Sequence, residues 1–330
     1  MKAWRAEQFG KPSEVLKLVD VDLPAPKAGE ALLRVLATNV GLPDKMIVEG
    51  NYFLTPSAPV TPGQEVVGIV EAVGDGYPYL VGMRVIAGAN FMTGSGGLAE
   101  YCLSPSEGTV PAPEDMPDEQ AASFLGTFHV AYVGLVNRAA ARPGQTLLVL
   151  GGAGGVGSTA IQLGKALGLN VIAAVRGDDQ AEFCREQGAS HVVDTRTGSL
   201  DDEVRALTGG KGADIIYDTV GAVLAEQALR AIAIGGRYIM IGFAGGAGFP
   251  EFEPLKILKL GISVTGALHT VRTAEERDEA VRTLGRLFSE GKISVPIDDV
   301  IPFADVGQAL DRLGGGVKGK LIARVSERRA

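Results

Sequence analysis

LLVLGGAGGVG, residues 147–157, is the stretch that decides the fold of this chain. Four apolar residues typical of a buried strand lead directly into a loop with five glycines, and residues 155–167 are then predicted to form a helix. A second strand is predicted from Val171, which completes the context of a dinucleotide-binding loop. There glycines let the backbone approach a pyrophosphate, and the helix N-terminus supplies free N–H groups. We therefore expect the whole loop to bind the cofactor: Gly151, Gly152, Ala153, Gly154, Gly155, Val156 and Gly157.

Around this loop, the chain alternates strand and helix from about Pro117 onward. Apolar strands are predicted at 146–150, 171–175, 191–194, 215–217, 238–241 and 262–266, with helices at 155–167, 178–187, 199–207 and 222–232. Apolar strands separated by helices indicate a parallel sheet covered on both faces. Six of them in sequence predict an α/β fold, a Rossmann-type doubly wound domain.

The two ends of the chain show a different pattern. The first 110 residues contain short β-rich runs separated by Gly and Pro, which is typical of an irregular β-barrel. Near the end, 274–290 predicts an amphipathic helix with Thr273 as its N-cap and Glu276 completing a capping box, and 320–325 predicts a last strand. We expect this tail to pack on the first domain. The predicted domains are 1–120, 121–265 and the returning segment 266–330.

Composition restricts the partners and the compartment. There are 31 basic and 39 acidic residues, so the net charge of -8 disfavours nucleic acid and anionic membranes. No apolar run is long enough for a membrane helix and the start has no apolar stretch like a signal peptide, so we expect a cytoplasmic protein. Two cysteines, Cys102 and Cys184, rule out a disulfide framework and a four-cysteine zinc site.

The end of the second predicted strand bears on the choice of dinucleotide. NAD-binding domains carry an acidic residue there, but this chain has Val175 followed by Arg176. A guanidinium suits the 2′-phosphate of NADPH, and Arg196 after the third strand is a second candidate. Asp178 and Asp179 are the alternative, because either can hold the ribose of NADH. We favour NADPH over NADH.

Several segments together resemble the medium-chain dehydrogenase/reductase superfamily, in its zinc-free quinone oxidoreductase (zeta-crystallin-like) branch. The matching segments are 62–70 (PGQEVVGIV), 96–101 (GGLAEY), 142–145 (RPGQ), the glycine loop, 188–189 (GA), 212–221 (GADIIYDTVG) and 235–237 (GGR). The resemblance implies a GroES-like first domain completed by the C-terminal tail, a Rossmann second domain and an active cleft between them. It also implies a homodimer, joined through the sheet edge near 262–268.

The zinc-free branch follows from two positions. Zinc alcohol dehydrogenases resemble this chain but place a cysteine and a histidine ligand where it has Gly41 and Gln64. Neither residue replaces a thiolate or an imidazole on zinc. The three histidines, His129, His191 and His269, have no metal-site spacing, so we expect no metal.

Without a metal, the reaction implied is hydride transfer to a small conjugated carbonyl compound, a quinone or an enone, whose own carbonyl delocalises the developing charge. Tyr52 matches the tyrosine of the family's Gly-x-Tyr turn and is the first candidate donor to the substrate oxygen; packing for shape is the alternative. Asn39 is a candidate substitute for the family asparagine that Gly41 replaces. Asp44 matches a family aspartate, for which we favour a structural role.

Further cofactor contacts are expected from loops that follow the later strands and from the entry to the second domain. Gly242, Phe243 and Ala244 follow the fifth strand, at the edge where ligands bind in such sheets, and Val220 lies in the matched segment 212–221. Thr127 is a further candidate near the nicotinamide, although a threonine bonded to its own helix explains it equally well. Lys318 and Lys320 can reach a phosphate or be solvated, and we favour solvation.

Other functions remain open at this point. An enoyl-thioester reductase, of the acryloyl-CoA type, uses the same cofactor and hydride step. A non-catalytic NADPH-binding sensor or scaffold is compatible with the missing asparagine at Gly41. A metal-dependent alcohol dehydrogenase is disfavoured by Gly41 and Gln64.

Overall fold

The computed structural model describes residues 1–328 apart from Ala247, Phe249 and 269–272, so His269 lies outside the described residues. The chain forms two units, Met1–Gly126 with Ile297–Ala330, and Thr127–Pro296. The predicted boundary at 266 is therefore wrong, because the return to the first unit begins only at Ile297. Just before that boundary, the side chain of Gln162 exchanges hydrogen bonds of 2.8 and 2.9 Å with the backbone of Ser294, which holds the chain to the second unit there.

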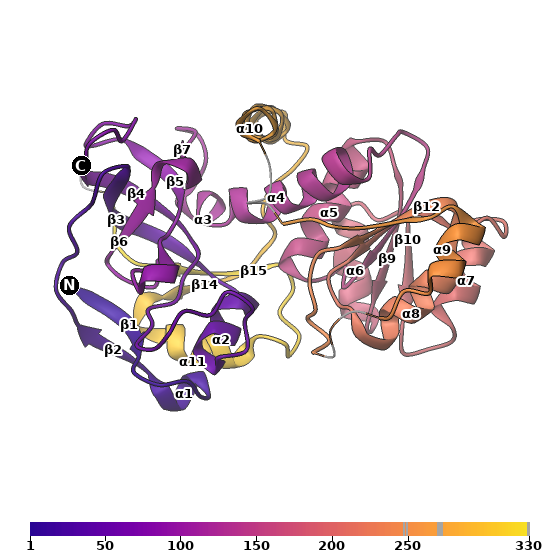
Figure 1. Cartoon of the computed structure of the whole chain (residues 1–330), viewed down its shortest axis with the longest axis horizontal. Helices are drawn as coiled ribbons and strands as arrows, with labels where there is room; N and C mark the ends of the chain where they lie inside the picture. The colour runs from indigo at the N-terminus through magenta and orange to yellow at the C-terminus, as the bar shows by residue number, and fades with distance from the viewer. Residues whose placement is uncertain (247, 249, 269–272, 329–330) are drawn as a thin grey trace. The chain divides into compact units, whose positions relative to one another are not determined.

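The second unit contains the predicted doubly wound sheet. Its strands are β8 (Thr146–Leu150), β9 (Asn170–Val175), β10 (His191–Asp194), β11 (Ala213–Asp218), β12 (Ile232–Met240) and β13 (Ser263–Gly266). They are all parallel and lie in the order β10-β9-β8-β11-β12-β13. Figure 1 labels β9, β10 and β12 among the helices of this unit. The order reverses between β8 and β11, so the glycine loop that follows β8 lies at the switch point, where ligands bind in such folds.

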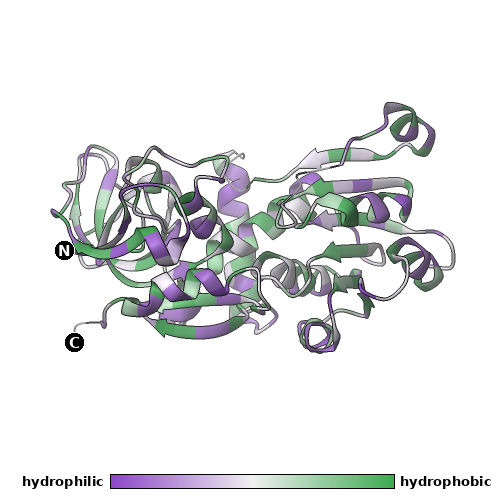
Figure 2. Cartoon of the chain, turned by 90° about the horizontal axis from the view of Figure 1, so that it is seen from below, coloured by the Kyte–Doolittle hydropathy of each residue, from purple (hydrophilic) through white to green (hydrophobic). Residues whose placement is uncertain are grey.

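Helices cover both faces of this sheet, as predicted. They are α5 (Gly155–Ala166), α6 (Asp178–Glu186), α7 (Leu200–Leu207), α8 (Ala222–Arg230) and α9 (Pro254–Leu260). One core cluster joins α7, α8 and α9 to alternate strand residues such as Leu148 and Ile172. Helices α5 and α6 cover the opposite face of the sheet. Beside Gly152, residue Ala173 of β9 lies close to both of these helices. Figure 2 shows the strands largely in the hydrophobic colour and the helices in mixed colours, the pattern of a sheet buried on both sides.

The first unit is the predicted irregular β structure, completed by both ends of the chain. Its strands are β1 (Lys2–Ala6), β2 (Leu16–Asp20), β3 (Glu30–Val40), β4 (Glu65–Val73), β5 (Arg84–Gly88), β6 (Tyr101–Pro105), β7 (Thr109–Pro111), β14 (Ile297–Pro302) and β15 (Lys320–Arg324). The main sheet has the order β14-β15-β3-β4-β5-β7, with β6 also pairing β3. β15 runs antiparallel to β3 and sets Ile322 opposite Asn39, so the predicted return of the tail is confirmed.

Short helices complete the first unit, and two longer ones belong wholly or largely to the second. The helices of the first unit are α1 (Pro12–Val15), α2 (Leu42–Glu49), α3 (Asp118–Ala121) and α11 (Val306–Arg312). α4 (Phe124–Tyr132) leads into the second unit, and α10 (Ala274–Ser289) has the predicted capping box between Thr273 and Glu276. None of the helices described here has the length and apolar character to cross a lipid bilayer.

Candidate functional site

The glycine loop is a tight turn whose shape depends on the absence of side chains. Gly151 has a φ of +71°, a conformation that L side chains disfavour. The N–H groups of Gly151 and Gly152 both donate to the carbonyl of Ala174, at 3.1 and 3.3 Å, which ties the loop to β9. A Cβ on Gly157 would lie only 2.2 Å from the carbonyl oxygen of Gly151. Helix α5 and the end of β8 therefore approach each other as closely as the backbone allows.

The outer side of the same loop is open and offers backbone donors. Gly154 is the N-cap of α5 and carries no side chain to cap it, and a Cβ built there would come no closer than 3.5 Å to the protein. The first-turn N–H groups of a helix have no partner within the helix, and its dipole favours an anion at that end. Room for a close ligand together with free donors fits a pyrophosphate.

The loops after β11 and β12 meet beside the glycine loop. The hydroxyl of Thr219 donates to the carbonyl of Leu150 at 2.8 Å, and Asp218 accepts hydrogen bonds of 2.8 Å from the N–H groups of Val220 and Gly221. The N–H of Ala244 donates to the carbonyl of Thr219 at 3.2 Å. Val220 and the predicted contacts Gly242, Phe243 and Ala244 thus gather at the carboxyl edge of the sheet.

Asp218, which organises these loops, is itself buried in the sheet. Burial raises the pKa of its carboxyl group, and the hydroxyl of Tyr238 on the neighbouring strand donates to it. The position of Val220 therefore depends on a buried acid that the sequence analysis did not single out.

Arg176 and Arg196 lie at the same carboxyl edge, on the other side of the glycine loop. Val175 and Asp194 are opposite each other in β9 and β10, so Arg176 and Arg196 follow neighbouring strand ends. The Arg196 guanidinium donates to the Asp194 carboxylate, with a shortest distance of 2.7 Å. The edge thus carries two arginines at β9 and β10, the glycine loop at β8, and Val220 and Ala244 at β11 and β12.

Thr127 lies in α4 at the start of the second unit, and its backbone contacts the glycine-loop helix α5. Its carbonyl accepts a hydrogen bond of 3.5 Å from the hydroxyl of Thr159 in α5. Thr159 also donates to the carbonyl of Val156 at 2.9 Å, within the glycine-loop helix. Thr127 is 2% exposed, so its position links the start of this unit to the cofactor-binding helix.

In the first unit, Asp44 holds two backbone segments together. Its Oδ2 accepts from the N–H of Gly41 at 2.8 Å and its Oδ1 accepts from the N–H of Gly63 at 2.9 Å. The side chain is 1% exposed, and burial raises the pKa of its carboxyl group to about 6. These contacts support the structural role that we favoured, because both carboxylate oxygens are engaged with the backbone.

Tyr52 and Gln64 lie together in this unit, and Asn39 lies in the adjoining strand. Burial raises the pKa of Tyr52 more than the nearby side chain of Gln64 lowers it, so the phenol stays protonated near neutral pH. Nε2 of Gln64 and Oδ1 of Asn39 are buried with no hydrogen-bond partner among the residues that the structure describes. Buried polar atoms normally have partners. These amides are therefore candidates to bind a ligand.

The prediction that Lys320 is solvated is wrong. Although the residue as a whole is only partly buried, burial of its amino group lowers its pKa, and the charges of Glu65 and Asp44 oppose that shift. Glu65 is 7% exposed, its Oε1 accepts from the N–H of Gly126 at 2.8 Å, and burial raises its pKa to about 7. The β15–β3 pairing brings the lysine to these carboxylates across more than 250 residues of sequence. The sequence analysis missed this cluster, which we call the Lys320 cluster (Asp44, Glu65 and Lys320).

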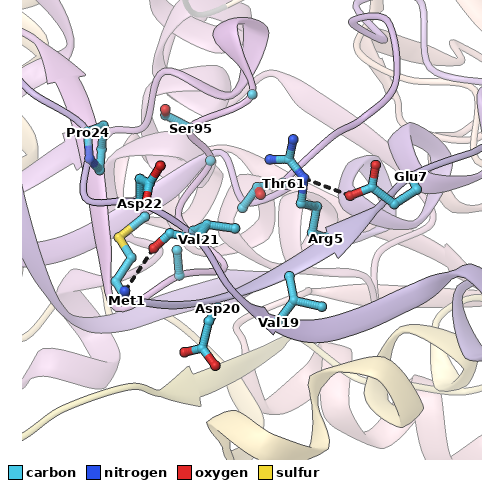
Figure 3. A pocket seen from close by; sticks show the side chains of 13 residues that line it. Met1, Arg5, Glu7, Val19, Asp20, Val21, Asp22, Pro24, Thr61 and Ser95 are labelled. Atoms are coloured by element: carbon cyan, nitrogen blue, oxygen red, sulfur yellow. Dashed lines mark hydrogen bonds and ion pairs between the residues drawn. The ribbon is translucent and has the colours of Figure 1, made fainter.

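A cavity of about 670 Å³ also lies in the first unit, lined by β1, the end of β2 and the loop around Ser95 (Figure 3). Two of its charged groups have local partners. The Arg5 guanidinium donates to Glu7 at 3.0 Å, and the amino group of Met1 donates to the carbonyl of Val21 at 2.9 Å. Tyr52, Asn39 and Gln64 do not line it, so it is separate from the residues singled out above.

The positions that carry zinc ligands in alcohol dehydrogenases are used differently here. Gly41 caps α2 and donates its N–H to Asp44, and Gln64 lies beside Tyr52. Within residues 1–328, omitting those not described, no group of three or more His, Cys, Asp and Glu side chains is arranged to hold a metal ion. The described part of the chain thus offers no complete set of ligands.

Comparison with known proteins agrees with this architecture. Residues 27–114 match the family described as alcohol dehydrogenase GroES-like domain, and residues 155–286 match the family described as zinc-binding dehydrogenase. The quinone oxidoreductases of Rattus norvegicus and Homo sapiens are each 32% identical over 326 residues, which is 98% of this chain and 97% of each relative.

Solved structures give the same result. A mycobacterial protein solved in complex with NADPH has a TM-score of 0.90 and 31% identity, and the match covers 98% of this chain and 100% of that one. A quinone oxidoreductase of Pseudomonas syringae has a TM-score of 0.88 and 28% identity, over 98% and 99% of the two chains.

A β-rich unit built from both chain ends and a doubly wound unit with a glycine loop at its switch point define a two-domain oxidoreductase of the dinucleotide-dependent class. The chain belongs to the medium-chain dehydrogenase/reductase superfamily, in its quinone oxidoreductase group.

Proposed function

We propose that the protein is an NADPH-dependent reductase of quinones or other α,β-unsaturated carbonyl compounds that works by direct hydride transfer without a metal. The observation that carries this proposal is the open glycine loop at the switch point, with Arg176 and Arg196 at the two neighbouring strand ends. The similarity to quinone oxidoreductases and to a protein solved with NADPH supports it.

Each part of the carboxyl edge has a role in this proposal. Residues 151–157 bind the pyrophosphate through backbone N–H groups, and the two arginines bind the 2′-phosphate. Val220 and residues 242–244, with Thr127, line the nicotinamide end and exclude water from it. When bound, NADPH supplies the hydride from its nicotinamide ring.

On the substrate side, Tyr52 is the proposed hydrogen-bond donor to the carbonyl oxygen. Its burial and its raised pKa keep the proton on the phenol at neutral pH. Nε2 of Gln64, which is unpartnered among the described residues, is the proposed second donor to that oxygen, and Oδ1 of Asn39 is a candidate acceptor for a hydroxyl or N–H group of the ligand. Asp44 acts through the backbone of Gly41 and Gly63 and does not itself touch the substrate.

We further propose a homodimer and a cytoplasmic location. Strand β13 is the edge of the parallel sheet, and pairing of two such edges satisfies their open backbone groups. Cys102 and Cys184 are both buried free thiols, as expected in a reducing compartment. Light scattering of the purified protein tests the first proposal, and cell fractionation tests the second.

The decisive experiment follows the loss of NADPH absorbance by stopped flow over a panel of quinones, enones and acryloyl-CoA, with NADH in parallel. Turnover of quinones or enones with NADPH, in protein shown by elemental analysis to lack zinc, is the expected result. Saturation with the CoA thioester alone would instead identify an enoyl-CoA reductase. Tight NADPH binding with no turnover of any acceptor would identify a non-catalytic sensor or scaffold. If Arg176→Ala keeps the full preference for NADPH, the account of cofactor choice is wrong.

A further inference from the structure

We infer that Asp194 is a positioning residue for cofactor selection: it fixes Arg196 against Gly177, so that Arg196 and Arg176 together bind a phosphomonoester on the adenosine ribose. The inference rests on the proposed NADPH-binding function and deepens it. Asp194 is the last residue of β10, and the sequence analysis assigned it no role.

The contacts of Asp194 converge on one arginine. Its Oδ1 accepts from the backbone N–H of Arg196 at 3.0 Å and from Nε at 3.1 Å. Its Oδ2 accepts from Nε at 3.1 Å and from Nη2 at 2.7 Å. The backbone N–H of Gly177 contributes to the lowered pKa of this carboxylate. Asp194 therefore orients the Arg196 guanidinium, which lies between the loop after β9 and the loop after β10.

Gly177 supplies the surface on which the guanidinium lies. A Cβ on this residue would lie 3.1 Å from Cζ, Nη1 and Nη2 of Arg196 alike. Equal distances to the three atoms mean that the plane of the guanidinium faces the Gly177 backbone. Glycine at this position, with a φ of +93°, lets the group lie flat.

This arrangement leaves donors available for an anion. A guanidinium has five N–H groups, and Asp194 takes only those of Nε and one on Nη2. The Nη1 donors remain, at the edge where Arg176 follows the neighbouring strand. No partner for the Arg176 guanidinium is found among the described residues. Two arginines with free donors suit a phosphate dianion better than a ribose hydroxyl pair.

The same contacts explain why an acid at this edge does not favour NADH. A carboxylate selects the NAD ribose by accepting from its hydroxyl groups. Asp194 already accepts from Arg196 with both oxygens, and those bonds hold its pKa down to about 2. It therefore stays ionised and occupied at neutral pH, and its effect on the ligand passes through the arginine.

The test uses two probes that need no turnover, adenosine 2′,5′-bisphosphate and 5′-ADP, with binding to the whole protein measured by calorimetry. Asp194→Asn keeps the shape but loses the charge that holds the guanidinium. We expect about five- to tenfold weaker binding of the 2′,5′-bisphosphate and less than twofold change for 5′-ADP. Arg196→Ala is expected to weaken the same probe by about tenfold or more. In the Arg196→Ala background, Asp194→Asn should then have no further effect.

Glu182→Gln is the matched control, because it removes the same charge from an exposed position of α6 without breaking a contact to Arg196. Tighter binding of the 2′,5′-bisphosphate by Asp194→Asn would overturn the inference, since Asp194 would then merely repel the phosphate. Equal weakening of both probes would reduce Asp194 to a structural residue and overturn it as well.

The outcomes separate this inference from the proposed function. A protein that shows the expected binding pattern but reduces no acceptor retains the inference and loses the proposed activity. A protein that reduces quinones with NADPH, and is indifferent to Asp194→Asn, retains the activity and loses the inference.

Discussion

The carboxyl edge of the parallel sheet and the Lys320 cluster of the first unit are polar sites built in different ways. The first consists mainly of backbone groups, and the second consists of charged side chains. At the sheet edge, glycines between 151 and 157 present backbone groups, and a side chain there would occupy the ligand's space or the turn itself. In the Lys320 cluster, two buried acids accept hydrogen bonds from the backbone of Gly41, Gly63 and Gly126, and the charge of Lys320 acts on both acids. The first site depends on local backbone geometry, and the second on charges brought together by distant strands. Substitutions should therefore affect ligand binding at the first and folding stability at the second.

The largest expected effect comes from Lys320→Met. Removing the only cation of the cluster leaves two buried acids without a counter-charge, which we expect to lower the unfolding free energy by about 3 kcal/mol. Urea denaturation at pH 7.5 measures it. Lys318→Met, two residues away and outside the cluster, should change the unfolding free energy by less than about 0.5 kcal/mol. Equal stability of the two variants would contradict the assignment of the cluster.

Gly157→Ala tests the backbone site. The added methyl would lie 2.2 Å from the Gly151 carbonyl oxygen, so we expect a loss of about 1–3 kcal/mol of stability. NADPH binding, followed by fluorescence titration, should weaken at least tenfold because the loop must shift. Gly285→Ala in α10, where nothing lies within 4 Å, is the control and should be neutral or stabilising. Unchanged NADPH affinity in Gly157→Ala would show that the turn does not bind the diphosphate.

The pH dependence of the unfolding free energy tests the Lys320 cluster without a substitution. Burial raises the folded-state pKa of Glu65 from 4.5 to about 7, so the folded protein binds the proton more tightly than the unfolded chain. This contribution is fully present below about pH 4.5 and is lost as pH rises toward 7. We expect the unfolding free energy to fall by about 2–3 kcal/mol over that range.

Glu65→Gln is the matched variant for this pH series, since it cannot titrate. Denaturation midpoints measured from pH 4.5 to 7.5 should become flatter in the variant. Asp44, whose pKa is raised to about 6, keeps a smaller slope at lower pH. An identical slope in wild type and variant would mean that Glu65 is ionised throughout.

Tyr52→Phe should have the smallest effect. Losing one neutral hydrogen-bond donor costs about 1 kcal/mol, which corresponds to a three- to tenfold lower kcat, with NADPH affinity unchanged. Tyr77→Phe is the control, because that hydroxyl bonds to Thr109 on another part of the unit. A kcat equal to wild type would leave Tyr52 a packing residue, the alternative that the sequence allows.

The same contrast explains what the sequence could predict. The six parallel strands, the glycine loop and the capping box of α10 are encoded by neighbouring residues, and their predicted positions agree with the structure to within a few residues, except that β12 begins at Ile232, six residues before the predicted start. Helix α2 was missed because it is short and begins Leu42-Pro43 after a glycine. The Lys320 cluster and the contact of Arg196 with Gly177 depend on strand pairing. No local pattern therefore marked Lys320 or Asp194.

The closure of the first unit by β15 also sets the order in which the protein can fold during synthesis. Residues 127–296 form a continuous segment, so this unit is complete in sequence while the ribosome is still adding the tail. The partner edge of β3 must wait until residues 320–324 have emerged, and only then does Lys320 reach the acids. A nascent chain of the first 126 residues thus exposes an unpaired strand edge, which is a hazard for aggregation. The emergence of residues 320–324, more than translation of any earlier segment, is the step that completes the first unit.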